Sequence, residues 1–132
     1  MGKISKPLEP RSEECVIQLH NELIKLFGGT YGLRDVNLLR AALTRPFGGL
    51  ANGTKFFPTI IEQSAALLEA MIEYHPFVDG NKRTATITTL FYLEDNGYSL
   101  HYSDEEIIEF AVNIASGKMK FEQIYEWMKE RI

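Results

Sequence analysis

The stretch from His75 to Ala85 constrains the fold of this chain more than any other part of the sequence. It reads HPFVDGNKRTA and separates two segments with helical patterns. Ile60–Tyr74 has apolar side chains at spacings of three and four, and Asn81–Asn96 is predicted to be a second helix that Gly97 ends. The motif therefore lies at a helix–loop–helix junction. The start of the second helix is a natural anion site, because its N–H groups are free and its dipole is positive there.

The rest of the chain is predicted to form further helices separated by short turns. A first helix follows Ser12 and ends at Gly28, and a short one runs from Asp35 through Leu43 to a stop at Pro46. Two capping-box patterns occur, at Thr59–Glu62 and Ser103–Glu106, and the second opens a helix through about Ala115; a final helix carries Phe121, Ile124, Tyr125 and Met128. The predicted fold class is all-α.

Composition indicates an ordinary globular protein. The 132 residues suit a single domain, 1–132, and the contents of 45% apolar and 24% charged residues are typical of such domains. No apolar run approaches the roughly 20 residues that span a membrane, and no signal-peptide pattern follows Met1. A net charge of −4 without a basic run argues against nucleic acid as the main partner. We therefore expect a cytoplasmic protein with no membrane contact.

The motif contains the residue types needed to bind a metal–nucleotide and to deprotonate a hydroxyl group. His75 is the candidate general base, because an imidazole is largely neutral and able to accept a proton at cellular pH. Asp79 is the candidate Mg²⁺ ligand, since Mg²⁺ is commonly held by one or two carboxylates together with phosphates and waters. A helix N-cap is the alternative role for Asp79. His20 and His101 have no such neighbours in the sequence, so we interpret them as surface or core histidines.

The next four residues are candidates for phosphate binding. Gly80 would let the backbone approach a phosphate without a Cβ atom, and Arg83 offers a bidentate clamp for phosphate oxygens. Lys82 adds a second cation to this local patch. Asn81 has two open roles, orienting a phosphate or stabilising the loop. Phe77 is predicted to be a hydrophobic anchor of the loop.

The motif resembles the signature of the Fic/Doc superfamily, H-x-F-x-D/E-G-N-x-R. All six fixed positions match: His75, Phe77, Asp79, Gly80, Asn81 and Arg83. The stretch GGTYGLRD at residues 28–35 and the residues that follow it up to Pro46 resemble the N-terminal half of Doc (death-on-curing) proteins. The resemblance covers roughly residues 12 to 130. It implies a compact Fic-fold helical bundle.

The segment Phe47–Pro58 is neither helical nor low in complexity. It carries three glycines and several large apolar side chains, and Asn52-Gly53 favours a two-residue hairpin turn. Resemblance to Fic proteins implies a β-hairpin flap here, which would align a target polypeptide by strand addition. The alternative is a plain surface loop.

Lys82 and Thr86 separate two possible reactions. Fic proteins that transfer AMP usually have Gly where Lys82 stands and a second Arg where Thr86 stands, whereas N-K-R-T-A resembles the Doc pattern. That resemblance implies Mg²⁺ and ATP as cofactors, with the γ-phosphate facing the histidine and transfer of a phosphoryl group. Gly80 departs from the best-known Doc pattern, which has Ala there. Protein adenylyltransfer therefore stays open as an alternative.

By resemblance, the chain is expected to be a Doc-like toxin of a toxin–antitoxin system. It would be a kinase that phosphorylates a Ser or Thr hydroxyl of a protein, with elongation factor Tu as the expected target and translation arrest as the result. A small antitoxin docking over the active site is the expected partner, because no internal inhibitory motif of the type S/T-x-x-x-E-G-N is recognised. A catalytically inactive, peptide-binding Fic domain is a further alternative.

Overall fold

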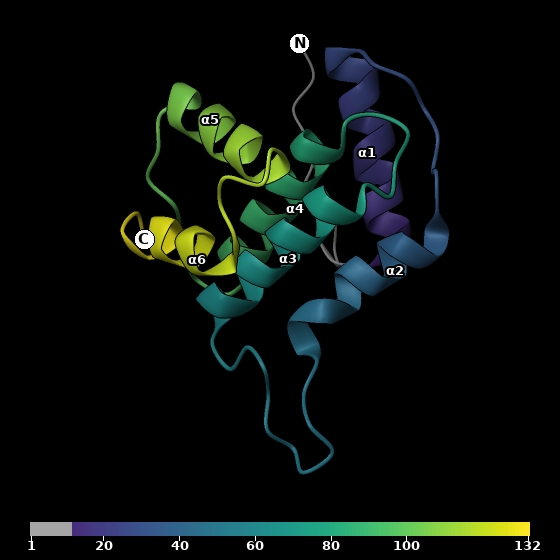
Figure 1. The fold of residues 1–132 in the computed structure, drawn as a ribbon. Helices are drawn as coiled ribbons and strands as arrows, with labels where there is room; N and C mark the ends of the chain where they lie inside the picture. Colours follow the sequence, from purple (N-terminus) through teal and green to yellow (C-terminus); the bar gives the residue numbers. More distant parts are fainter. Residues whose placement is uncertain (1–11) are drawn as a thin grey trace.

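The computed structural model describes residues 12–132, which form a bundle of helices (Figure 1). In chain order the elements are α1 (Glu13–Phe27), α2 (Val36–Thr44), the 3-10 turn η1 (Arg45–Phe47), α3 (Ile60–Tyr74), α4 (Asn81–Asp95), α5 (Asp104–Ala115) and α6 (Phe121–Lys129). The all-α prediction is confirmed, and the helix bounds agree closely with the expected ones. Predictions about positions 1–11, including the absence of a signal peptide, lie outside the described residues.

Local capping explains where the helices begin. The side chain of Ser12 accepts a hydrogen bond from the N–H of Cys15, and Asp35 accepts from two N–H groups at the start of α2. Ser103 and Glu106 form a complete capping box at α5. The other predicted box is half formed, because the Thr59 hydroxyl accepts from the N–H of Glu62 but donates to its carboxylate.

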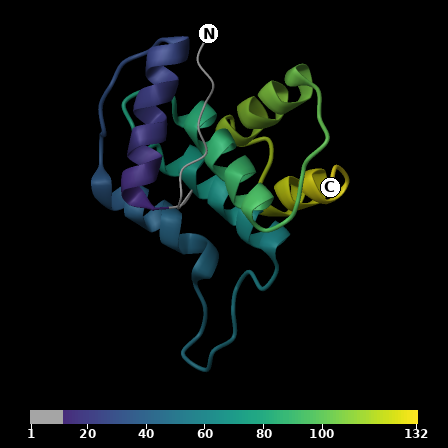
Figure 2. The same cartoon turned by 180° about the vertical axis from the view of Figure 1, so that it is seen from behind.

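α3 is the central helix of the bundle. Every residue from Gln63 to Ile72 is buried, and α3 packs against α2, α4, α5 and α6. Figures 1 and 2 show α3 and α4 side by side in the middle of the molecule, with α1 and α2 on one side and α5 and α6 on the other. A helix that is buried on all sides fixes the position of its C-terminal end, which is where the motif begins.

α4 carries an unusual set of buried polar groups. The hydroxyls of Thr84, Thr88 and Thr89 are buried without a hydrogen-bond partner. All three side chains are almost fully buried, so the energetic cost of placing them there lies in the unpaired hydroxyls. Within residues 12–132, no helix is long and apolar enough to cross a membrane.

The predicted β-hairpin flap is not confirmed as a hairpin of regular strands. Backbone pairing in this segment consists of one isolated bridge between Gly49 and Lys55 and a few turn hydrogen bonds. The N–H of Leu50 donates to the carbonyl of Thr54, which leaves a three-residue loop rather than the expected two-residue turn. The segment projects from the body in both views (Figures 1 and 2).

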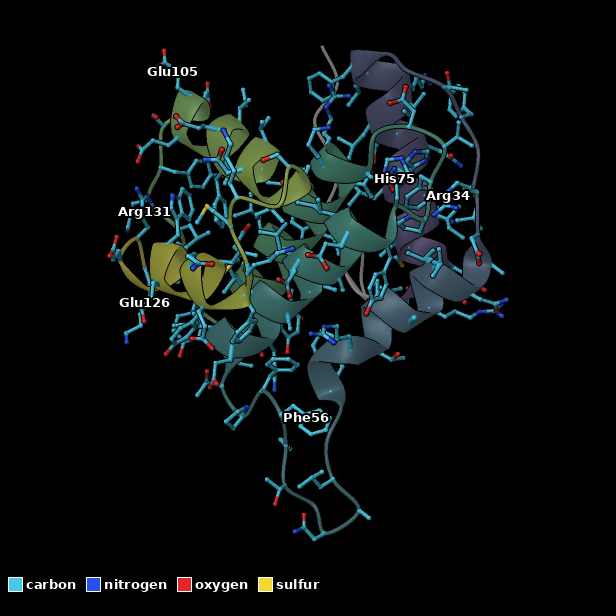
Figure 3. The ribbon with its side chains drawn as sticks, in the orientation of Figure 1. Arg34, Phe56, His75, Glu105, Glu126 and Arg131 are labelled. Carbon is cyan, nitrogen blue, oxygen red and sulfur yellow. The ribbon has the colours of Figure 1, made fainter. Side chains whose placement is uncertain are left out.

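The position of this loop also bears on its predicted role. The loop lies before the N-terminus of α3, and His75 follows its C-terminus. The 15 residues of α3 form a helix about 22 Å long, which separates the loop from His75. Figure 3 shows Phe56 and His75 toward opposite ends of the molecule. This arrangement favours the surface-loop alternative over a flap beside the motif.

Candidate active site

The loop between α3 and α4 starts with a residue in a rare conformation. His75 is the C-cap of α3 and has φ 54° and ψ 54°, a left-handed backbone. No other described residue apart from glycines has a positive φ. For a residue with a Cβ atom this conformation costs about 1–2 kcal/mol, so surrounding contacts must hold it. His75 itself is exposed to solvent, whereas Pro76 and Phe77 are buried.

Asn81 fixes the middle of this loop from the start of α4. Its Oδ1 accepts a hydrogen bond from the N–H of Phe77 at 2.9 Å, and its Nδ2 donates to the carbonyl of Phe77, also at 2.9 Å. Asn81 is buried, and the Phe77 ring is 1% exposed. Of the two roles considered for Asn81, these contacts are those of a residue that stabilises the loop. Phe77 lies in the core as the predicted anchor.

A second buried side chain supports the loop from α1. The ring of His20 stacks on Phe77 with centroids 3.9 Å apart, and its Nε2 donates to the carbonyl of Asp79 at 2.7 Å. His20 was interpreted as a surface or a core histidine, and its burial places it in the core. Its contact with the motif could not be read from the sequence, because its partners lie more than fifty positions away in the chain.

Asp79 is held with its carboxylate exposed. Oδ2 accepts from the N–H of Thr30 at 3.0 Å, and Oδ1 accepts from the N–H of Gly80 at 2.8 Å. These two hydrogen bonds lower the pKa of Asp79 below its ordinary value, and the nearby Arg83 acts in the same direction. Because its pKa is lowered, the carboxylate is ionised at neutral pH. Each oxygen keeps a further lone pair that can bind a cation.

Glycine is required beside Asp79 by geometry. Gly29 has φ +117°, and a Cβ atom placed there would lie 2.8 Å from Oδ2 of Asp79. Gly80, the N-cap of α4, has φ +76°. Its Cβ would approach the end of the Ile24 side chain to 3.1 Å. Both glycines thus keep the backbone close to the carboxylate.

A cavity of about 1140 Å³ opens beside the loop, and all six predicted site residues line it. They are His75, Asp79, Gly80, Asn81, Lys82 and Arg83. The first turn of α4 forms one wall together with Thr86, and Phe27 and the glycines after α1 form a rim. The opposite wall is α5, where Ile108 and Val112 are exposed apolar side chains.

The charged groups at this cavity favour an anion near α4. Lys82, Arg83 and Lys120 line it, against the carboxylates of Asp79 and Glu73, and Lys120 lies 3.4 Å from Glu73. No side chain caps the N-terminus of α4, so the N–H groups of its first turn are available to a ligand. The guanidinium of Arg83 lies over the Phe27 ring at 4.8 Å, which leaves its N–H edge open.

These residues fit a metal–nucleotide better than a bare metal. Residues 12–132 contain no cluster of three or more His, Cys, Asp or Glu side chains that could hold an ion. Asp79 would be a single carboxylate ligand, which suits Mg²⁺ when phosphates and waters fill its other positions. The adjacent helix N-terminus and cations suit the phosphates themselves.

Comparison with known proteins agrees with this geometry. A family model described as "Fic/DOC family" matches residues 10–93. A Toxin Doc from Mycolicibacterium smegmatis is 40% identical over 74 residues, which is 56% of this chain and 56% of that protein. The Protein kinase doc of Escherichia phage P1 is 29% identical over 118 residues, covering 89% of this chain and 91% of the phage protein. The match thus spans little more than half the length of the mycobacterial relative.

The chain therefore belongs to the Fic/Doc family. Both of these relatives carry Doc names, so within the family it lies on the Doc-like branch.

Proposed function

We propose that this chain is a Doc-type toxin that transfers the γ-phosphoryl group of Mg·ATP to a Ser or Thr hydroxyl of a protein. The observation that carries the proposal is the phosphate-binding wall of the cavity. Lys82 lines it from the first turn of α4, and the neutral Thr86 stands one turn further on, with its hydroxyl donating to the carbonyl of Lys82 at 2.7 Å. The two relatives, one named as a toxin and one as a protein kinase, support the proposal that this chain is a phosphoryl-transferring toxin.

His75 would act as the general base. Its unprotonated ring nitrogen accepts the proton of the target hydroxyl while that oxygen attacks the γ-phosphorus. The bond between the γ-phosphorus and the β,γ-bridging oxygen breaks, and ADP leaves with that oxygen. Lys82, Arg83 and the first N–H groups of α4 would neutralise the phosphate charge. Bound through Asp79, Mg²⁺ would supply further charge neutralisation.

Adenylyltransfer is the second candidate reaction, in which the α-phosphorus is attacked and pyrophosphate leaves. Gly80 is the observation in its favour, because glycine at this position is typical of Fic proteins. However, the positive φ of Gly80 gives a backbone reason for glycine that applies to either reaction. Lys82 and Thr86 therefore weigh more, and we favour phosphoryl transfer.

The proposed partners follow from the Doc resemblance. Elongation factor Tu is the proposed target, with translation arrest as the consequence. An antitoxin is the proposed inhibitor, docking its terminal segment over the cavity. The exposed Ile108 and Val112 on α5 border the cavity and offer an apolar contact for such a segment.

Labelled ATP distinguishes the two reactions directly. The purified protein is incubated with elongation factor Tu and Mg²⁺, using either γ-labelled or α-labelled ATP. We expect label on the target from the γ position only. Label from the α position would replace the proposal with adenylyltransfer, and no label from either would refute this target.

Two variants serve as controls in the same assay. His75→Ala should lower the rate by about 10²–10⁴-fold while nucleotide affinity measured by calorimetry is retained. Asp79→Ala should instead weaken the binding of Mg·ATP. Near-normal transfer by His75→Ala would show that another group is the base.

A further inference from the structure

A segment between α1 and α2 runs alongside the motif loop. We call residues 29–35 the brace. The N–H of Val78 donates to the carbonyl of Gly32 at 2.9 Å, Leu33 and Phe77 form an antiparallel bridge, and the N–H of Arg34 donates to the carbonyl of Pro76 at 2.8 Å. The brace therefore pairs with the loop as a short antiparallel strand would.

The side chain of Arg34 extends this pairing to the end of α3. Its Nε donates to the carbonyl of His75 at 2.7 Å, and its Nη2 donates to the carbonyl of Tyr74 at 2.8 Å. Figure 3 shows Arg34 and His75 next to each other. The two acceptors are consecutive carbonyls at the negative end of the α3 dipole, where a cation is favoured.

The chemistry of these two bonds is specific to arginine. The planar guanidinium presents adjacent N–H donors in a fixed fork, which matches two carbonyl oxygens at once. A lysine ammonium at the same place has no such fork. The bond to the His75 carbonyl also falls on the one described non-glycine residue with a left-handed backbone.

We propose that Arg34 is a positioning residue, which holds the backbone of His75 in its left-handed conformation and thereby aims the imidazole at the cavity. The proposal rests on the role of His75 as the base in the proposed function. Without Arg34, the last turn of α3 loses its only side-chain partner for these two carbonyls among the described residues. The ring would then sample orientations away from the reacting hydroxyl, and small misplacements of this kind cost up to about 100-fold in rate.

The test compares Arg34→Met and Arg34→Lys with a matched control, Arg40→Met. Arg40 lies on α2, and its Nε donates to Glu13 at 2.8 Å in an exposed ion pair away from the cavity. We expect Arg34→Met to lower kcat about 10- to 100-fold, with less than about a 3-fold change in the Kd for Mg·ATP. Arg34→Lys should recover part of the loss, and Arg40→Met should leave kcat unchanged.

A second measurement does not depend on activity. The one-bond coupling between Cα and Hα of His75, measured by NMR, depends on φ and ψ and is distinctly low for a left-handed backbone. It should change in Arg34→Met and stay the same in Arg40→Met. If the wild-type protein transfers no phosphate, the proposed function fails while this coupling still tests the positioning role.

Three outcomes would overturn the role of Arg34. One is an unchanged His75 coupling in Arg34→Met, whatever happens to the rate. Another is a parallel loss of kcat and nucleotide affinity, which would indicate general damage to the site. The last is a kcat that stays at the wild-type value although the coupling changes.

Discussion

Removing the side chain of Asn81 should destabilise the whole fold, although this residue lies in the motif proposed to bind phosphate. Its amide makes two hydrogen bonds to the backbone of Phe77, both at 2.9 Å and both in a buried environment. Asn81→Ala leaves a buried N–H and a buried carbonyl without partners. Each such group costs about 1–3 kcal/mol, so the free energy of unfolding should fall by about 2–6 kcal/mol.

A change of this size is measurable by urea denaturation, because the total stability of a domain is only about 5–15 kcal/mol. Asn52→Ala is the matched control. Asn52 also uses Oδ1 to accept from a backbone N–H, that of Thr54 at 3.0 Å, but in an exposed loop where water replaces the lost partner. Its variant should lose no more than about 1 kcal/mol.

The two roles considered for Asn81 give opposite results. A residue that stabilises the loop affects stability in the absence of any ligand. A residue that only orients a phosphate affects ATP affinity and leaves apo stability near that of Asn52→Ala. The second pattern would refute our interpretation of the Asn81 contacts.

Three further predictions test other parts of the structure. Gly29→Ala should weaken Mg·ATP binding in calorimetry more than Gly53→Ala does, because both glycines have a positive φ but only a Cβ at position 29 would collide with Asp79. Glu69→Gln should raise the melting temperature at pH 7, since burial, helped by Glu73, raises the pKa of Glu69 and its ionised form is disfavoured in the fold. This gain should vanish below about pH 4, where the carboxyl group is protonated in both states, and an undiminished gain at low pH would contradict it. Thr88→Val, which removes an unpaired buried hydroxyl and keeps the shape, should stabilise the protein by about 1 kcal/mol in urea denaturation.

Helix positions could be predicted from the sequence because their signals are local. Ser12, Asp35, Thr59 and Ser103 cap the helices they were expected to cap, each through a contact with a group within three residues. The loop before α3 was harder to predict, because Asn52-Gly53 is compatible with more than one turn length. The three-residue loop found there places Gly53 at the positive-φ position.

The cavity-lining residues of the motif could also be predicted, because they lie within one short stretch of the chain, residues 75–83. The residues that hold the motif in place could not. Arg34 and His20 bond to residues 41 and 59 positions away, and each bond is made to a backbone carbonyl. A carbonyl acceptor is present at every residue, so the sequence contains no sign of which one a distant arginine or histidine will bind.

The contacts that support the loop share one feature, which explains how its backbone is held in place while two of its polar side chains stay exposed. Asn81 binds the N–H and carbonyl of Phe77, His20 binds the carbonyl of Asp79, and Arg34 binds the carbonyl of His75. Each of them holds the backbone of the loop and leaves the side chains of His75 and Asp79 exposed at the cavity. A catalytic side chain on a mobile loop would lose its orientation between encounters with a substrate. Support through the backbone avoids this and keeps the side chains of the proposed base and the proposed metal ligand exposed. The residues around the loop are therefore expected to affect rate and stability rather than the identity of the transferred group.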